Sequence, residues 1–174
     1  GSGSTVDSSN NSANGLIRND DVDLALSASV GSAVEGDTVN PGQLSYTVTR
    51  SGDLSVSTTV DWSVVAGTAT AADFAGGVLP SGSVSFAAGE TTQTITIDLA
   101  GDGAWEGNEA FTVQLSNASA HADITSNNIA GQIVDDDDTL TLSGVSVNHA
   151  EGNSGTTVYT FSITRSGTGK LLRK

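Results

Sequence analysis

The stretch Thr91-Thr-Gln-Thr-Ile-Thr-Ile-Asp-Leu99 decides the fold class of this chain. Apolar and polar positions alternate along it, with Ile95, Ile97 and Leu99 on one side and Thr94, Thr96 and Asp98 on the other. A period of two is typical of a β-strand that turns one face to a core and the other to solvent. Thr and Ile also favour strands. The stretch therefore predicts an amphipathic strand.

Six further segments carry strand patterns and are separated by turn residues. They are 24–34, 44–49, 60–64, 84–86, 111–115 and 129–134. We find no stretch with the periodicity of a helix, and Ser51-Gly52-Asp53 and Ala88-Gly89 have the composition of turns. The pattern predicts an all-β fold, a seven-stranded antiparallel immunoglobulin-like β-sandwich. We expect the turn at Ala88-Gly89 to join its two flanking strands into a hairpin.

The chain repeats itself at a spacing of 116 residues, which places Gly131–Ser143 on Gly15–Ser27. With a one-residue gap, Tyr159–Gly167 falls on Leu44–Gly52. Such a period suits whole sandwich domains in tandem. We expect a tag remnant and the end of a preceding repeat in 1–21, a complete repeat in 22–138, the opening strands of a truncated following repeat in 139–167, and a cloning-derived tail in 168–174.

Composition restricts the partners of the chain. Twenty Asp and Glu face six Lys and Arg, which gives a net charge of −14. Nucleic acid and anionic membranes are therefore excluded as expected partners, and no apolar run is long enough to insert into a membrane. Cysteine is absent and only two histidines occur, so a zinc site is not expected. Cations are the natural partners of this surface.

Strand order gathers the acidic loops at one end of the predicted sandwich. Asp73 follows the third strand, Asp102–Glu109 follow the fifth and Asp135–Asp138 follow the seventh, whereas Glu35 precedes the second. Because successive strands run in opposite directions, the loops after odd-numbered strands emerge at the same end. The sequence therefore predicts one acidic pole.

Crowded carboxylates at this pole repel one another by about 1 to 4 kcal/mol for a pair at 4 Å. A hard divalent cation relieves that repulsion, and Ca²⁺ accepts irregular sets of six to eight oxygen ligands. Calcium is the metal that we infer. The alternative is that these are solvated carboxylates of an acidic secreted or halophile-type protein. Neither an EF-hand loop nor a calcium-binding nonapeptide repeat is present.

Several motifs in order resemble the Calx-beta domain, over roughly Val30 to Asp138. They are Gly67-Thr-Ala with Asp73-Phe74, Gly82-Ser-Val-Ser-Phe86, Gly89-Glu-Thr91, Thr94-Ile-Thr-Ile97, Glu106-Gly-Asn-Glu-Ala-Phe-Thr-Val-Gln-Leu-Ser-Asn117 and Ile133-Val-Asp-Asp-Asp137. This module is found in sodium-calcium exchangers and as tandem copies in large bacterial surface proteins. The resemblance implies a sandwich with Ca²⁺ bound by the loops at one end.

Carried over by position, the calcium ligands of the family fall on Glu35, Asp73, Asp102, Glu106, Glu109, Asp135, Asp136 and Asp137. These residues coincide with the acidic pole. One departure is that Gly101-Asp102-Gly103 keeps a single acid where calcium-sensing members have a run of acids. The resemblance therefore implies fewer or weaker calcium sites than in the sensors.

The function that we expect is a calcium-binding structural repeat of a large extracellular adhesin-like protein, on a bacterial surface or secreted. Its partners are calcium ions and neighbouring repeats of the same chain, because Asp135–Asp138 connect one repeat to the next. Two alternatives are a regulatory calcium sensor of a membrane transporter and a sugar- or protein-binding sandwich that uses Trp105. No catalytic motif is apparent, so we do not expect an enzyme. Exposed strands of the truncated repeat favour a truncation-induced dimer.

Overall fold

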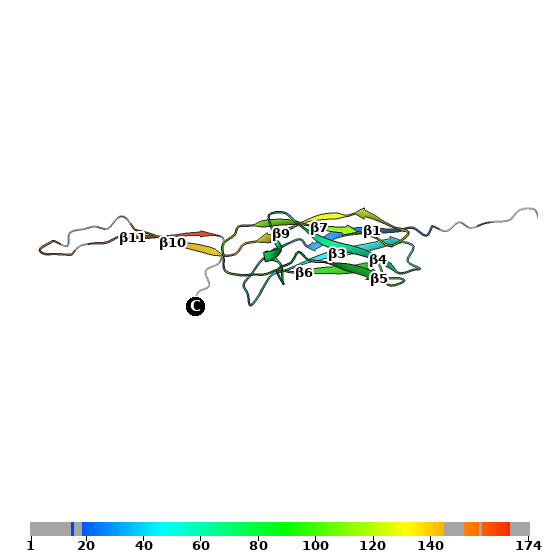
Figure 1. Ribbon diagram of the computed structural model, residues 1–174, viewed down its shortest axis with the longest axis horizontal. Coiled ribbons are helices and arrows are strands. Elements are labelled where there is room, and N and C mark those ends of the chain that lie inside the picture. The colour runs from blue at the N-terminus through cyan, green and yellow to red at the C-terminus, as the bar shows by residue number, and fades with distance from the viewer. Residues whose placement is uncertain (1–14, 16–18, 145–151, 157, 168–174) are drawn as a thin grey trace, which may run out of the picture.

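The predicted alternation of side chains builds two facing β-sheets in a computed structural model that describes residues 15, 19–144, 152–156 and 158–167. One sheet has the order β6-β3-β1-β8, with β1 at Val22–Val30, β3 at Gln43–Gly52, β6 at Thr92–Asp98 and β8 at Ala122–Ser126. The other has the order β2-β9-β7-β4-β5, with β2 at Ser32–Val34, β4 at Thr58–Ala66, β5 at Ser81–Phe86, β7 at Glu109–Ser116 and β9 at Asn128–Val134. Figure 1 shows the two layers lying along the long axis of the molecule.

The core lies between these sheets and comes from every second residue of the long strands. Ile95 and Ile97 of the deciding stretch are buried, and they face side chains such as Val113, Leu115 and Phe111 from the opposite sheet. Phe74 and Phe111 meet edge to face with ring centroids 5.3 Å apart. The alternating pattern thus fills the space between two layers, as expected of a sandwich. The predicted all-β sandwich is confirmed.

The first predicted strand divides between the two sheets, and a strand that the sequence analysis missed, β8, precedes the last predicted strand. β1 ends at Val30 and β2 begins at Ser32, whereas β8 ends at Ser126 and β9 begins at Asn128. The sandwich consequently has nine strands among the described residues instead of seven. β1 pairs with β8 and β2 pairs with β9 in parallel, because the segments 22–34 and 122–134 run towards the same end. Alternation of side chains shows which face is buried but not the direction of the neighbouring strand.

The predicted hairpin between residues 84–86 and 91–99 is wrong. β5 pairs with β4, and β6 pairs with β3 in the other sheet. Phe86 and Ile95 both point into the core, and they do so from opposite layers. The Ala88-Gly89 turn therefore crosses from one sheet to the other at the end of the sandwich.

A separate two-stranded sheet continues the chain beyond the sandwich. It consists of β10 at Asp138–Gly144 and β11 at Phe161–Gly167, and it projects from one end of the molecule in Figure 1. Of the tag remnant and the end of a preceding repeat predicted in 1–21, the structure describes only residues 15 and 19–21, and the tail predicted in 168–174 lies outside the described residues. Within the described ranges, no helix has the length and hydropathy needed to cross a membrane.

Candidate metal centre

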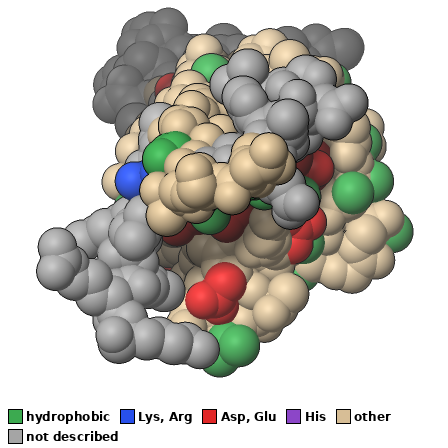
Figure 2. Space-filling view, turned by 90° about the vertical axis from the view of Figure 1, so that its left-hand side faces the viewer, with side chains coloured by type: hydrophobic (Ala, Val, Ile, Leu, Met, Phe, Trp, Pro, Cys, Tyr) green, Lys and Arg blue, Asp and Glu red, His purple; other side chains and the backbone are tan. Residues whose placement is uncertain are grey.

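Four connections meet at the end of the sandwich from which β10 and β11 project. Glu35 follows β2 and Asp135 follows β9, and their segments are joined because Glu35 N–H donates to the Val134 carbonyl at 3.0 Å. The loop after β4 contains a 3₁₀ turn, η1 at Ala71–Asp73. Ala100 N–H, which follows β6, donates to the Asp73 carbonyl at 2.9 Å. These bonds hold together loops that strand order predicts to meet at one end. Acidic side chains are visible on this face in Figure 2.

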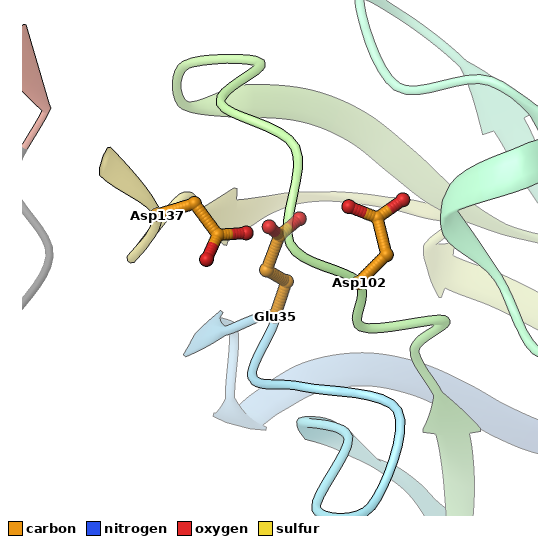
Figure 3. Close-up of side chains that lie close together, drawn as sticks. All are labelled: Glu35, Asp102 and Asp137. Carbon is orange, nitrogen blue, oxygen red and sulfur yellow. The ribbon is translucent and has the colours of Figure 1, made fainter. Parts of the chain in front are cut away.

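Glu35, Asp102 and Asp137 form the first acidic cluster. One carboxylate oxygen from each lies within 4.8 Å of the others, and the three side chains come from three separate segments and point toward one another in Figure 3. Gly101 allows this approach. A Cβ at position 101 would lie 2.5 Å from the Gly36 carbonyl oxygen and 2.7 Å from that of Glu35. The absence of a side chain at 101 therefore lets Asp102 come beside Glu35.

Asp73, Glu106 and Glu109 form the second acidic cluster, with one oxygen from each again within 4.8 Å. Asp73 is held by a capping box, because its Oδ2 accepts hydrogen bonds from Thr70 N–H at 2.6 Å and Thr70 Oγ1 at 3.1 Å. The Thr-x-x-Asp spacing of such a box is visible in the sequence, although the sequence analysis did not use it. Asp73 thereby presents a fixed carboxylate to Glu106 and Glu109.

Asp135 connects the acidic loops without belonging to either three-residue cluster. Its side chain is buried, and Oδ2 accepts from Glu106 N–H at 3.1 Å and Gly107 N–H at 2.6 Å. Oδ1 accepts from Asp137 N–H at 2.9 Å. Asn108, which the sequence analysis overlooked, accepts a bond from Asp135 N–H at 3.2 Å through its side chain. This one carboxylate therefore orients both the 106–107 segment and the start of the connection to β10.

Asp136 is a predicted site residue that belongs to neither acidic cluster. Its side chain is exposed, and Oδ1 accepts a hydrogen bond from Gly36 N–H at 3.2 Å. The carboxylate thus supports the backbone beside Glu35. Of the eight predicted residues, six lie in the clusters, Asp135 orients their loops and Asp136 lies beside them.

Burial and mutual repulsion raise several carboxyl pKa values at this pole. Burial, followed by the charge of Asp135 and a hydrogen bond with Asp137, raises the pKa of Glu35 from 4.5 to about 8. The pKa of Glu109 rises to about 7, first through burial and then through its hydrogen bond with Asp73. Burial is also the largest cause of the raised pKa of Glu106 and of Asp137. Without a cation, the pole therefore retains protons at neutral pH.

The donor set fits a hard divalent cation. Glu35 Oε1 and Asp137 Oδ2 are buried without a hydrogen-bond partner, and a buried carboxylate oxygen in that state is costly. Among the described residues, the two arginines are engaged elsewhere. Arg50 donates to the Ala87, Asp53 and Val56 carbonyls, and Arg165 pairs with Asp138. Carboxylate oxygens from flexible loops are ligands that Ca²⁺ accepts.

The chain is similar to a known domain family and to solved structures. The Calx-beta domain family model matches residues 19–138. The apo-form Calx CBD1 domain is 28% identical, with a TM-score of 0.54, and the match covers 66% of this chain and 98% of that domain. No curated protein sequence matches the chain.

Two structures of longer proteins are also similar. CBD12 from CALX1.2 is 27% identical with a TM-score of 0.55, and the match covers 67% of this chain and 49% of that one. The calcium binding domain CBD12 of CALX1.1 is 26% identical with the same TM-score and the same two coverages, 67% and 49%. This chain thus spans about half of each CBD12 protein. Because the family model covers most of the chain and the fold and acidic loops agree with it, the chain belongs to the Calx-beta domain family.

Proposed function

We propose that this module is a calcium-binding structural repeat of a large extracellular adhesin-like protein, in which bound ions stiffen the junction to the next repeat. Calx-beta domains bind Ca²⁺ and are binding or regulatory modules instead of catalysts. The proposed ligands are the six residues of the two clusters together with Asp135. Asp136, whose carboxylate lies on the Gly36 amide, is the predicted ligand that the geometry supports least.

The observation that carries the proposal is the position of Asp137 in the chain. It belongs to the first acidic cluster with Glu35 and Asp102, and the next residue, Asp138, is the first residue of β10. An ion held by this cluster would therefore fasten the connection to β10 against two loops of the sandwich. Without an ion, the side chains of Glu35 and Asp137 are joined only by a hydrogen bond that requires a proton, which holds the connection less firmly than a divalent cation shared by three carboxylates.

The expected affinity follows from the location and the small ligand set. Extracellular calcium modules bind with Kd values of about 10⁻⁴ to 10⁻³ M, and Asp102 is the single acid of its Gly101-Asp102-Gly103 segment. At a hundredfold excess over Kd, binding adds about 2.7 kcal/mol to the free energy of unfolding. At about 1 mM Ca²⁺, which is a one- to tenfold excess over these Kd values, binding adds about 0.4 to 1.4 kcal/mol, so the proposed secreted or bacterial cell-surface location requires only a partly occupied site.

A regulatory calcium sensor of a membrane transporter is the second candidate. It is supported by the similarity to the calcium binding domain CBD12 of CALX1.1. Affinity separates the two functions, because a sensor requires a Kd in the micromolar range or below. A sugar- or protein-binding role has the exposed Trp105 in its favour, and retention of glycan binding in chelator would support it.

Two measurements test the proposal. Thermal unfolding in EDTA, in 5 to 10 mM Ca²⁺ and in equal Mg²⁺ should show a rise of several degrees that is specific to calcium and is lost in the Asp137→Asn, Glu106→Gln double variant. Cleavage of the 135–138 connection by a protease that cuts after Asp, and that works in EDTA, should slow at least tenfold with Ca²⁺. An unchanged unfolding midpoint would exclude a metal site, whereas a shifted midpoint with unchanged cleavage would exclude the stiffening.

A further inference from the structure

The outermost strands of the two sheets are not equally protected against pairing with another chain. β2 has only three residues, and β8 contains Asp123 and a shift of register against β1. β5 follows Pro80 and contains Gly82. Shortness, charge, irregular register, Pro and Gly all make an exposed edge a poorer template for pairing. β6 has none of these features over residues 92–97, and its Thr and Ile residues favour strands.

The open side of β6 follows from its pairing with β3. Arg50 N–H donates to the Thr91 carbonyl at 2.8 Å, and Leu99 N–H donates to the Gly42 carbonyl at 2.9 Å. These bonds lie at the two ends of the antiparallel β3–β6 ladder, in which hydrogen-bonded and non-hydrogen-bonded pairs alternate. The odd-numbered residues of β6 therefore turn their N–H and C=O groups towards β3, and the even-numbered residues turn theirs away from it.

Three threonines form an open row of backbone groups along this edge. They are Thr92, Thr94 and Thr96. Since β6 is the outermost strand of its sheet, their N–H and C=O groups meet no neighbouring strand within the described ranges. At the next even position, the Asp98 carbonyl accepts from Ala75 N–H at 3.0 Å, which closes the row towards the acidic pole. β6 runs along one long side of the molecule, whereas the β10–β11 hairpin projects from one end (Figure 1). The row is therefore accessible to a strand that approaches from the side.

The chemistry of the row indicates its partner. Only an extended strand satisfies alternating N–H and C=O groups, and residues 91–97 contain no charged side chain that requires an opposite charge. An identical strand meets both conditions. If a second copy of β6 lies antiparallel about a two-fold axis at Thr94, each Thr94 faces its equivalent, and Thr92 faces Thr96 of the second copy. The open groups of all three residues are then paired, and Thr–Thr neighbours across strands are favourable.

We propose that β6 is a self-association edge, at which two copies of this chain join their β6-β3-β1-β8 sheets into one continuous sheet across residues 92–96. Such a ladder buries less than about 1,200 Å² in total, which is the range of weak and transient contacts. The net charge of −14 opposes association, but repulsion between charges more than about 8 Å apart is largely screened at about 0.15 M salt. The contact uses neither the acidic pole nor the β10–β11 hairpin, so it forms in EDTA and in calcium alike.

Amide hydrogen exchange of the full chain, measured over a range of protein concentrations with sedimentation equilibrium alongside, tests the proposal. The amides of the open row should exchange at least tenfold more slowly in concentrated protein, where sedimentation shows dimers. β5 provides the matched control, because Val64 N–H donates to the Pro80 carbonyl and the odd-numbered residues of β5 consequently face outwards. The amides of these residues should exchange at the same rate at every concentration. They are Ser81, Ser83 and Ser85.

Two substitutions locate the contact in the dimer. Thr94→Lys places like charges next to each other at the two-fold axis, and it should weaken dimerisation at least tenfold. Ser83→Lys makes the same kind of change at the edge of β5 and should leave dimerisation unchanged. Both side chains are exposed, so neither substitution disturbs the core.

Four results would overturn the proposal. The first is slow exchange of the Thr94 amide in the dilute monomer, because the row would then be closed. The second is a chain that stays monomeric, with unchanged exchange, at every concentration. The third is an equal effect of Thr94→Lys and Ser83→Lys. The fourth is a dimer that survives Thr94→Lys and is lost in Leu142→Asp, because the exposed hairpin would then be the contact surface.

Discussion

Replacing Glu35 by Gln should increase the free energy of unfolding of the calcium-free protein and reduce the further increase that Ca²⁺ produces. The Glu35 side chain is 4% exposed, and the pKa of its carboxyl group is raised from 4.5 to about 8, mainly by burial. At pH 7 the folded protein therefore retains a proton on Glu35 that the unfolded chain releases. Gln has nearly the same shape and no charge to bury.

The magnitude follows from the difference between pH 7 and the unfolded pKa. A group with a raised pKa contributes its full stability below pH 4.5 and loses it as the pH rises to the folded value, at about 1.4 kcal/mol per pH unit. At pH 7 the loss is about 3 kcal/mol, and Glu35→Gln restores it. For a domain of this size the midpoint of thermal unfolding should rise by roughly 10 °C.

The assay is urea unfolding at pH 7 in EDTA and in saturating Ca²⁺. In EDTA, Glu35→Gln should be about 3 kcal/mol more stable than the wild type, and in calcium it should lose most of this advantage because a carboxylate ligand is missing. Glu90→Gln is the matched control, because Glu90 lies in the turn between β5 and β6, where its carboxylate accepts from Ala87 N–H. The reasoning is refuted if Glu35→Gln gains no stability in EDTA, or if Glu90→Gln gains as much.

Three further predictions concern pH, the Gly101 contact and the opposite end of the sandwich. In EDTA the free energy of unfolding should fall between pH 5 and 8.5, because the pKa values of Glu35 and Glu109 are raised to about 8 and about 7; urea titrations should show this slope vanish in saturating Ca²⁺, and a slope of opposite sign in EDTA would contradict it. Gly101→Ala should weaken calcium binding at least tenfold by calorimetry, whereas Gly103→Ala, whose Cβ meets nothing within 4 Å, should not; equal effects would contradict the role of the close contact. Arg50→Met should cost about 2 to 4 kcal/mol in EDTA and in calcium alike, because the buried Arg50 side chain makes three part-buried hydrogen bonds to carbonyl groups that then lose their donor; a cost confined to one condition would show coupling to the pole.

The alternation of apolar residues predicted the strands and the two layers, because burial of one strand face depends on local sequence alone. The Ile95 and Ile97 positions show this most clearly. Strand partners depend instead on contacts distant in sequence. The sequence therefore did not reveal that β5 and β6 separate into different sheets, nor that Gly31 marks the place where the first strand changes sheets.

The acidic pole was predictable from strand order, whereas the arrangement within it was not. Asp135, Asp136 and Asp137 are chemically identical, yet one orients loops, one supports Gly36 and one joins a cluster. Their separate positions depend on the backbone path between β9 and β10. The sequence specifies which residue types gather, and the directions of their side chains come only from the folded connection.

The parallel pairs β1–β8 and β2–β9 should make the module resistant to a pulling force. The chain enters the sandwich at β1 and leaves it after β9, and the β2–β9 ladder from Ser32–Gln132 to Val34–Val134 lies next to the exit. If the two ends of the module are pulled apart, each parallel ladder is loaded along its strands. Its hydrogen bonds then share the force and must break together, so the module should resist tension better than one that opens by peeling.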